Sequence, residues 1–285
     1  MKCIIILSIL ILPVIVYAED EMSQADQLSS IVAFLQGEIQ KTVTKDDKEY
    51  EIFIKQKCTS DYLPLTDKIS GTGFLVANGD LLYLVTAGHV AKGIKSKDIV
   101  TLKTTNDKPI SFELKEFLQR DNLDWAFSEK ADVAVLRLNP SNKVQPHLGE
   151  HFLEMQMLED KLESVSRDEP ILTIGFPLGL GIQEYFSPIS KESKASSGLI
   201  VLDRFDNQKK ATFILLDSPS VGGFSGAPVF KIPSLISRGN KITISNKIVC
   251  IGLIHGTISD ETGGKFAAVV PAYFIRELIQ GNGGR

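Results

Sequence analysis

The feature that most constrains the fold is a long series of short apolar runs, rich in β-branched and aromatic residues and separated by turn residues. No long amphipathic helices alternate with these runs, which argues against a doubly wound α/β sheet and favours an all-β sandwich or barrel. The turn Asn78–Gly79–Asp80 lies between two of the runs and predicts a β-hairpin. The expected strands cover residues 51–55, 73–76, 83–86, 99–102, 110–117, 133–138, 171–175, 198–202, 212–216, 228–230, 241–245, 248–254 and 265–270.

The expected strands fall into two groups, which predicts two β units of about 100 residues each. We expect the first unit over residues 48–140 and the second over 169–270. The charged segment 141–168 is interpreted as the connection between them. Residues 271–285 are expected to form a C-terminal helix and tail, with the helix over 272–279.

The segment before the first unit, residues 19–47, is polar apart from one apolar patch with helical spacing. This pattern predicts a helix that ends near Gln40. We interpret the segment as a propeptide or a docked N-terminal arm, and our hypothesis is that it restrains activity until it is trimmed. The patch consists of Leu28, Ile31, Val32, Leu35 and Ile39.

The chain opens with Lys2 and an apolar run over residues 3–17, followed by Ala18 and two acidic residues. The run is shorter than the roughly 20 residues that span a bilayer, and the small residue after it is typical of a signal-peptidase site. We expect residues 1–18 to be a secretory signal of a secreted or periplasmic protein, with no stable membrane anchor after cleavage; an uncleaved anchor is the alternative.

The net charge of −4 offers no basic stripe, so no nucleic-acid partner is expected. Cys3 lies in the expected signal, which leaves Cys58 and Cys250 either to pair in an oxidising compartment or to remain as two thiols. Neither belongs to a Cys/His cluster, so no metal site is expected.

Segment 221–230 places a serine among small residues, and an apolar run follows it. Glycines allow a sharp turn there, and such a turn can direct the amides of Gly223 and Ser225 at one point, where an oxyanion develops during acyl transfer. A glycine-rich hairpin without any catalytic role is the alternative interpretation of this segment taken alone.

Two other turns supply partners for a nucleophilic serine. His89 follows an apolar strand, and Asp132 begins another. A serine hydroxyl needs an adjacent base, and that base needs a third group that fixes its tautomer. Asp124 is the rival carboxylate, but no apolar strand follows it.

Together these segments resemble the trypsin-like, chymotrypsin-fold serine proteases, nearest to secreted bacterial peptidases of the HtrA/Deg and glutamyl endopeptidase types. The resemblance implies two antiparallel six-stranded β-barrels with the site between them. It also implies Ser225 as nucleophile, His89 as general base, Asp132 as orienting carboxylate, and Gly223 and Ser225 as oxyanion donors. The resembling segments are 71–76, 86–90, 131–138, 175–179, 197–201, 223–228 and 251–256.

The resemblance also bears on specificity and activation. The acidic pocket floor of enzymes that cut after Arg or Lys is missing, because Pro219 occupies that position. Phe224 replaces the Asp or Asn that usually precedes the nucleophile, so activation by pairing with a new N-terminus is not expected. The expected pocket residues are Ser220, His255, Gly256 and Thr257.

By resemblance to glutamyl endopeptidases, His255 would receive a Glu or Gln side chain; alternatively, His255 only forms hydrogen bonds within the barrel. The sequence therefore predicts a serine endopeptidase that acts on proteins or peptides without a cofactor. An α/β-hydrolase would need another glycine where Ala227 stands and a different order of triad residues. A protease-fold binding protein without catalysis is the second reading.

Overall fold

The structure is a computed structural model of the 285-residue chain. Both the expected signal at 1–18 and Cys58 lie outside the described residues. The described residues are 23–45, 48–51, 53–55, 62–64, 66–118, 123–149, 151–238, 241–245 and 247–282.

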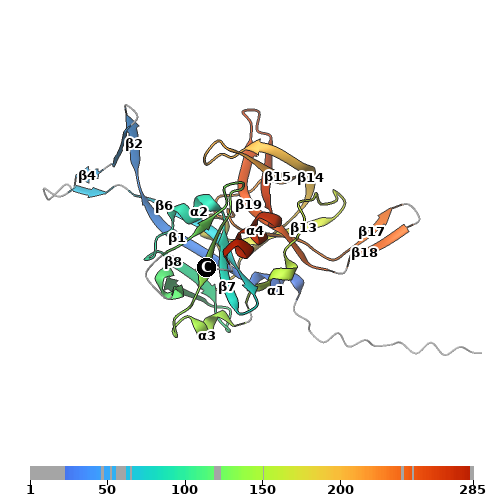
Figure 1. Cartoon of the computed structure of the whole chain (residues 1–285), viewed down its shortest axis with the longest axis horizontal. Coiled ribbons are helices and arrows are strands. Elements are labelled where there is room, and N and C mark those ends of the chain that lie inside the picture. The colour runs from blue at the N-terminus through green and yellow to red at the C-terminus, as the bar shows by residue number, and fades with distance from the viewer. Residues whose placement is uncertain are drawn as a thin grey trace, which may run out of the picture.

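Two β units lie side by side, as Figure 1 shows from the blue-to-green and the yellow-to-red parts of the chain. The first is an eight-stranded sheet with the path β10-β11-β7-β6-β1-β8-β9, and β12 pairs parallel to β6. Its strands are β1 (Val32–Gln40), β6 (Thr66–Asn78), β7 (Leu81–Thr86), β8 (Ile99–Lys103), β9 (Pro109–Glu113), β10 (Ala126–Phe127), β11 (Ala134–Leu138) and β12 (Leu153–Glu154).

The second unit is a closed barrel with the order β13-β14-β15-β20-β19-β16. Its strands are β13 (Pro170–Gly175), β14 (Ile189–Asp203), β15 (Lys210–Leu216), β16 (Pro228–Lys231), β19 (Val249–Ser259) and β20 (Lys265–Pro271). The all-β class with two units is confirmed, and the barrel has the six strands expected. The first unit is a sheet of eight strands instead of the expected six-stranded barrel. The strands β1, β10 and β12 were not expected in it, and the strand expected at 51–55 lies in the separate hairpins instead.

Short hairpins extend from both units (Figure 1). They are β2 (Thr42–Lys45) with β3 (Lys48–Glu51), β4 (Phe53–Lys55) with β5 (Tyr62–Pro64), and β17 (Ser234–Arg238) with β18 (Lys241–Ser245). The helices and 3-10 turns are α1 (Gln24–Ser29), α2 (Gly88–Gly93), η1 (Leu114–Phe117), α3 (Gln145–Leu148), η2 (Met155–Met157), η3 (Pro177–Gly179) and α4 (Ala272–Asn282).

The helix expected to run to Gln40 is wrong beyond Ser29, because residues 32–40 form β1. This strand pairs antiparallel with β6 on one side and with β8 on the other. Val32, Ala33, Phe34 and Leu35 are all buried, and a run that is buried on both faces of a sheet has no period that separates a strand from a helix. β1 is therefore a strand of the first unit, which agrees with a docked arm and argues against a propeptide over residues 32–40.

Other local predictions agree with the structure. The turn at 79–80 joins β6 to β7, and Gly79 has a φ of +59°, which a tight hairpin turn requires. The expected C-terminal helix is α4, which buries Ile275 and Ile279. It leaves the barrel and reaches the first unit, where Glu277 pairs with Lys130 at 2.6 Å.

Cys250 is a free thiol and fully buried on β19. Its sulfur donates to the carbonyl oxygen of Gly252 at 3.4 Å, and burial raises its pKa to about 12. A thiol that is buried and protonated is a poor nucleophile. The expected option of pairing with Cys58 is not realised at Cys250.

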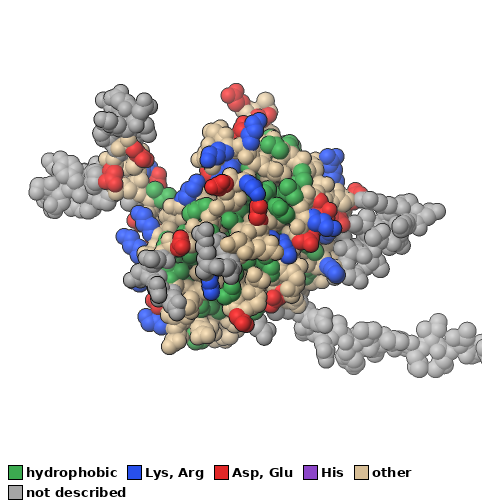
Figure 2. All heavy atoms as spheres, viewed as in Figure 1, with side chains coloured by type: hydrophobic (Ala, Val, Ile, Leu, Met, Phe, Trp, Pro, Cys, Tyr) green, Lys and Arg blue, Asp and Glu red, His purple; other side chains and the backbone are tan. Residues whose placement is uncertain are grey.

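The face in Figure 2 carries basic and acidic side chains interspersed, with apolar patches between them. None of the helices in the described part of the chain combines the length and the apolar character needed to cross a membrane.

Candidate functional site

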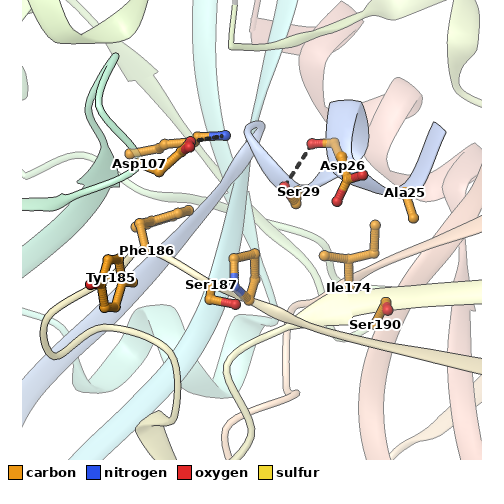
Figure 3. Close-up of a pocket in the computed structure, with 11 residues that line it drawn as sticks. Ala25, Asp26, Ser29, Asp107, Ile174, Tyr185, Phe186, Ser187 and Ser190 are labelled. Carbon is orange, nitrogen blue, oxygen red and sulfur yellow. Dashed lines mark hydrogen bonds and ion pairs between the residues drawn. The ribbon is translucent and has the colours of Figure 1, made fainter. Parts of the chain in front are cut away.

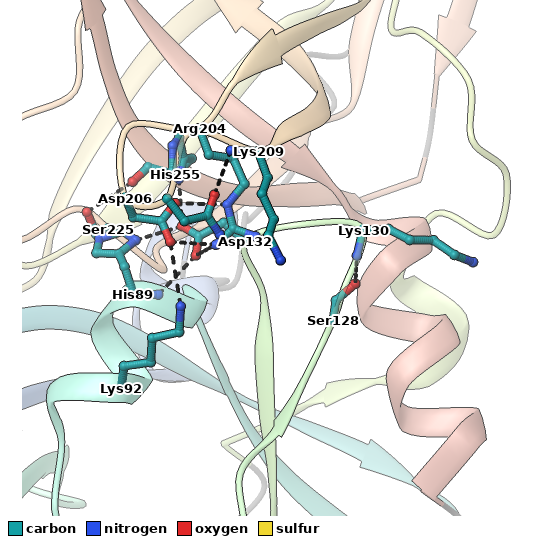
Figure 4. Close-up of polar contacts among 11 residues, drawn as sticks. His89, Lys92, Ser128, Lys130, Asp132, Arg204, Asp206, Lys209, Ser225 and His255 are labelled. Carbon is teal, nitrogen blue, oxygen red and sulfur yellow. Dashed lines mark hydrogen bonds and ion pairs between the residues drawn. The ribbon is translucent and has the colours of Figure 1, made fainter. Parts of the chain in front are cut away.

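Pairing between β7 and β11 brings His89 and Asp132 together. Thr86, the last residue of β7, lies opposite Ala134, the first residue of β11. His89 follows β7 in the first turn of α2, and Asp132 lies two residues before β11. Two residues from distant turns thus meet at one end of a strand pair, as Figure 4 shows.

The carboxylate of Asp132 is fully buried and accepts four hydrogen bonds. Its Oδ2 lies 2.6 Å from His89 Nδ1 and 2.6 Å from His255 Nδ1. Its Oδ1 accepts from the His89 backbone N–H at 2.9 Å and from Arg204 at 2.8 Å. The rival Asp124, by contrast, is exposed ahead of β10.

Burial alone would raise the pKa of Asp132, but the hydrogen bonds from His255 and His89 outweigh it and hold the pKa well below its ordinary value. The carboxylate is therefore ionised at neutral pH. With Nδ1 of His89 bound to Asp132, Nε2 remains as the acceptor of this ring.

His89, Asp132 and His255 also have the composition of a metal-ligand set. The two N–O distances of 2.6 Å argue against that use, because two ligands of a tetrahedral Zn²⁺ stand roughly 3.3 Å apart. The contacts are hydrogen bonds between two imidazoles and one carboxylate.

The loop between β15 and β16 presents Ser225. Gly223 and Gly226 have φ values of +96° and +84°, and a Cβ at either position would lie within 2.3 Å of a backbone oxygen. Only glycine fits this turn. Within the described part of the chain, the amides of Gly223 and Ser225 donate to no acceptor, as oxyanion donors require. Ser225 Oγ donates to the His255 carbonyl oxygen at 3.2 Å.

Thr72 on β6 joins the first unit to this loop, a role that the sequence analysis missed. Its backbone N–H donates to the Ser225 carbonyl oxygen at 2.9 Å. Its Oγ1 donates to the Gly223 carbonyl oxygen at 2.8 Å and accepts from the Phe176 N–H at 3.0 Å. Because Thr72 is fully buried, these bonds fix the oxyanion turn without competition from water.

Thr72→Val is expected to reduce both stability and turnover, because valine keeps the shape but leaves the buried Gly223 C=O and Phe176 N–H unpaired. We expect about 2–4 kcal/mol lower unfolding free energy and roughly tenfold lower kcat. Urea unfolding and peptide hydrolysis measure the two effects. Thr101→Val is the matched control: it removes the hydroxyl contact of a buried threonine on β8, to the exposed Ser111, and should lower stability alone. An unchanged kcat in Thr72→Val would contradict the assignment.

His255 does not face a substrate pocket, so the expectation that it would receive a substrate side chain is wrong. The residue is 1 % exposed, its Nδ1 contacts Asp132, and its Nε2 has no partner among the described residues. The ring lies between Phe205 and Phe213, with centroid distances of 4.2 and 5.1 Å. His255 is therefore the second imidazole that binds the Asp132 carboxylate. This agrees better with the alternative expectation, in which His255 only forms hydrogen bonds inside the protein.

A small pocket of about 10 Å³, enough for roughly one water molecule, lies beside the nucleophile loop. The other three expected pocket residues differ in how they contact it. Ser220 lines it. Thr257 donates from Oγ1 to the Ser220 carbonyl oxygen at 2.7 Å and so supports that wall. Gly256 lies against Phe205, whose ring leaves no room for a Cβ there.

Arg204 is the other site residue that the sequence did not indicate. It is 4 % exposed, and its guanidinium bridges Asp132 and Asp206 at 2.7–2.8 Å. It comes from the loop between β14 and β15, and a single arginine in a polar loop carries no pattern that predicts burial. Lys92 lies 3.8 Å from Asp206 and extends this charge network to the surface (Figure 4).

A separate cavity lies between α1 and segment 185–190 (Figure 3). Asp26 and Ser29 of α1 face Tyr185, Phe186 and the segment that follows them across it. None of the expected catalytic or pocket residues lines this cavity.

Comparison with known proteins relates this geometry to a family. The family model described as "Trypsin-like peptidase domain" matches residues 71–233, more than half of the chain. No curated protein matches the sequence. Among solved structures, Deg5 is 15 % identical with a TM-score of 0.46, and 88 % of each chain is covered.

Two further solved structures are similar at the same level. A thermostable serine protease, AL20, from an extremophilic microorganism is 10 % identical with a TM-score of 0.45, over 91 % of this chain and 100 % of that one. Human heparin binding protein is 13 % identical with a TM-score of 0.44, over 75 % and 86 %. At this level of sequence identity and structural similarity, the solved structures give no information about the reaction that this chain catalyses.

Proposed function

The chain belongs to the trypsin-like peptidase family and is a serine endopeptidase, and we propose that Ser225, His89 and Asp132 form its catalytic triad. The observation that carries the assignment is the pair of contacts from His89 to Asp132, at 2.6 and 2.9 Å. They fix both the ring and the backbone of His89, leaving Nε2 as the remaining proton acceptor.

In the proposed reaction, His89 Nε2 takes the proton of Ser225 Oγ while that oxygen attacks the carbonyl carbon of the scissile peptide bond. The resulting oxyanion accepts hydrogen bonds from the amides of Gly223 and Ser225. The C–N bond then breaks, and His89 returns the proton to the leaving amine. Water repeats the sequence on the acyl-enzyme and releases the acid.

Activation would not depend on a newly cut N-terminus. Phe224, which precedes the nucleophile, is 3 % exposed and packs in an apolar cluster with Ala227, Val229 and Ile254. An ammonium group could reach this position only by losing its hydration among apolar side chains, which is costly.

The proposal includes export, on the basis of the signal pattern at residues 1–18. N-terminal sequencing of the mature protein should then begin at Glu19, and a chain that keeps Met1 would contradict cleavage. The proposed preference for Glu or Gln before the cut can no longer depend on His255, because its Nδ1 is hydrogen-bonded to Asp132. It now requires another polar group in the pocket beside Ser225.

Digestion of an unfolded, carboxymethylated protein tests the proposed function. Mass spectrometry should detect new peptide termini with the purified 19–285 chain and none with Ser225→Ala or His89→Ala. His147→Ala is the matched histidine control, because His147 packs on Phe112 away from the site, and it should cleave normally. Cleavage that persists in Ser225→Ala would contradict the triad. A folded chain that binds but never cuts peptides would support the protease-fold binding protein instead.

A further inference from the structure

The carboxylate of Asp132 belongs to the first unit, but two of its three described side-chain partners come from the second. Arg204 lies in the loop between β14 and β15, and His255 lies on β19. His89 is the partner from the first unit. The orientation of the carboxylate, and with it that of the His89 ring, therefore depends on contacts across the boundary between the two units.

The guanidinium of Arg204 is held in one orientation by Asp206 (Figure 4). Nε donates to Oδ1 of that carboxylate at 2.8 Å, and Nη2 donates to Oδ2 at 2.7 Å, a bidentate contact that fixes the plane of an arginine. Nη2 also donates to Asp132 Oδ1 at 2.8 Å. The side chains of Arg204, Asp206 and Asp132 are 5, 8 and 0 % exposed, so water competes little for these bonds.

The loop that carries Arg204 is itself fixed against the site. The Arg204 N–H donates to the Lys209 carbonyl oxygen at 2.9 Å. Phe205, the next residue, stacks on the His255 ring with centroids 4.2 Å apart, and its ring meets that of His89 edge-to-face at 5.0 Å. Two consecutive residues of one loop therefore contact the buried carboxylate and both imidazoles.

We propose that Arg204 is a positioning residue for the triad: it holds Oδ1 of Asp132 so that Oδ2 stays directed at Nδ1 of His89. The inference rests on the proposed roles of Ser225, His89 and Asp132. Oδ2 receives both imidazoles at 2.6 Å, and a carboxylate that rotated about its Cβ–Cγ bond could not keep both contacts. The described contacts of Arg204 reach neither Ser225 nor His89, so its effect on the reaction passes through Asp132.

Peptide hydrolysis by Arg204→Met tests this role. We expect kcat to fall roughly 10- to 100-fold, the range for the loss of one hydrogen bond to a charged group. KM should change by less than about twofold, because the guanidinium contacts carboxylates behind the site rather than the oxyanion turn. A fall confined to kcat separates this role from a general loosening of the substrate-binding surface.

Arg204→Met leaves the buried Asp206 carboxylate with no described partner closer than Lys92, at 3.8 Å. The variant Arg204→Met/Asp206→Asn, which removes both buried charges, is therefore measured beside it and should show the same fall in kcat. Arg276→Met is the matched control. Arg276 also joins distant segments, through the carbonyl oxygens of Met155 and Leu158 at 2.6 and 3.1 Å, and its loss should lower stability and leave kcat unchanged.

Proton NMR of the Ser225→Ala form measures the same contact without catalysis. The Nδ1–H groups of the two imidazoles on Asp132 should give low-field resonances. Both should move when Arg204→Met/Asp206→Asn is added, because the carboxylate loses a donor and its fixed orientation. Arg276→Met should leave both resonances in place.

The two measurements separate the role of Arg204 from the proposed triad. An unchanged kcat in folded Arg204→Met/Asp206→Asn, or a lower kcat with unmoved resonances, overturns the positioning role and leaves the triad intact. If no form of the chain cuts peptides, the triad proposal fails and the resonances alone decide: movement supports the hold of Arg204 on Asp132, and constant positions overturn it.

Discussion

Replacing Asp132 by asparagine is expected to lower kcat by roughly 10³- to 10⁴-fold and the unfolding free energy by about 3 kcal/mol. The amide of asparagine cannot accept from two imidazoles and a guanidinium at once, so His89 loses the group that fixes its tautomer. Arg204, which is 4 % exposed, keeps only Asp206 as a buried counterion.

The stability loss in Asp132→Asn should depend on pH. Because folding lowers the pKa of Asp132, its ionised form stabilises the fold above the ordinary value of 3.8, and this contribution disappears as the pH falls further, through the lowered pKa. Urea unfolding of both forms should therefore show a full difference at neutral pH that narrows below about pH 3.8. Asp124→Asn, at the exposed rival carboxylate, is the control and should change neither quantity. A kcat within tenfold of the unmodified chain in Asp132→Asn would contradict the assignment.

Removing the N-terminal segment through β1 is expected to abolish folding rather than release activity. A chain that begins at Thr42 lacks the strand between β6 and β8 and exposes sheet edges that are normally paired. The buried side chains of Val32, Phe34 and Leu35 alone contribute about 5–9 kcal/mol, which is comparable with the roughly 5–15 kcal/mol that stabilises a typical domain.

Far-UV circular dichroism and thermal unfolding measure this effect. The chain that begins at Thr42 should show no cooperative transition and no peptide hydrolysis, whereas a chain that begins at Ser23, ahead of α1, should retain both. A soluble Thr42 chain with higher activity than the full mature form would restore the propeptide interpretation.

The strands were predictable where their patterns are local. The alternation around Gly79 predicts a hairpin, and the single apolar face of α4 predicts a terminal helix; both depend only on neighbouring residues. β1 could not be recognised in this way, because its four buried residues in a row satisfy helical and strand periods equally. Its identity comes from pairing with residues 66–74 and 99–101, which no local pattern encodes.

In the site, too, the residues that lie in local sequence motifs were predictable, and those positioned by contacts between distant segments were not. Motif context singled out His89, Asp132 and Ser225 because each lies in a recognisable turn beside an apolar strand. The orientation of the His255 ring depends on stacking against Phe205 and Phe213. Phe205 belongs to the loop between β14 and β15, and Phe213 belongs to β15. Thr72 and Arg204 form polar contacts between segments that are far apart in the sequence, so single positions carried no signal for them.

Labelling with a fluorophosphonate probe tests the central claim most directly, because only an activated serine reacts with it. The purified 19–285 chain should gain one covalent adduct, and fragment mass spectrometry should locate it at Ser225. Labelling should disappear in Ser225→Ala and fall steeply in His89→Ala. A folded chain that forms no adduct, or forms one at another serine, would contradict the proposed triad.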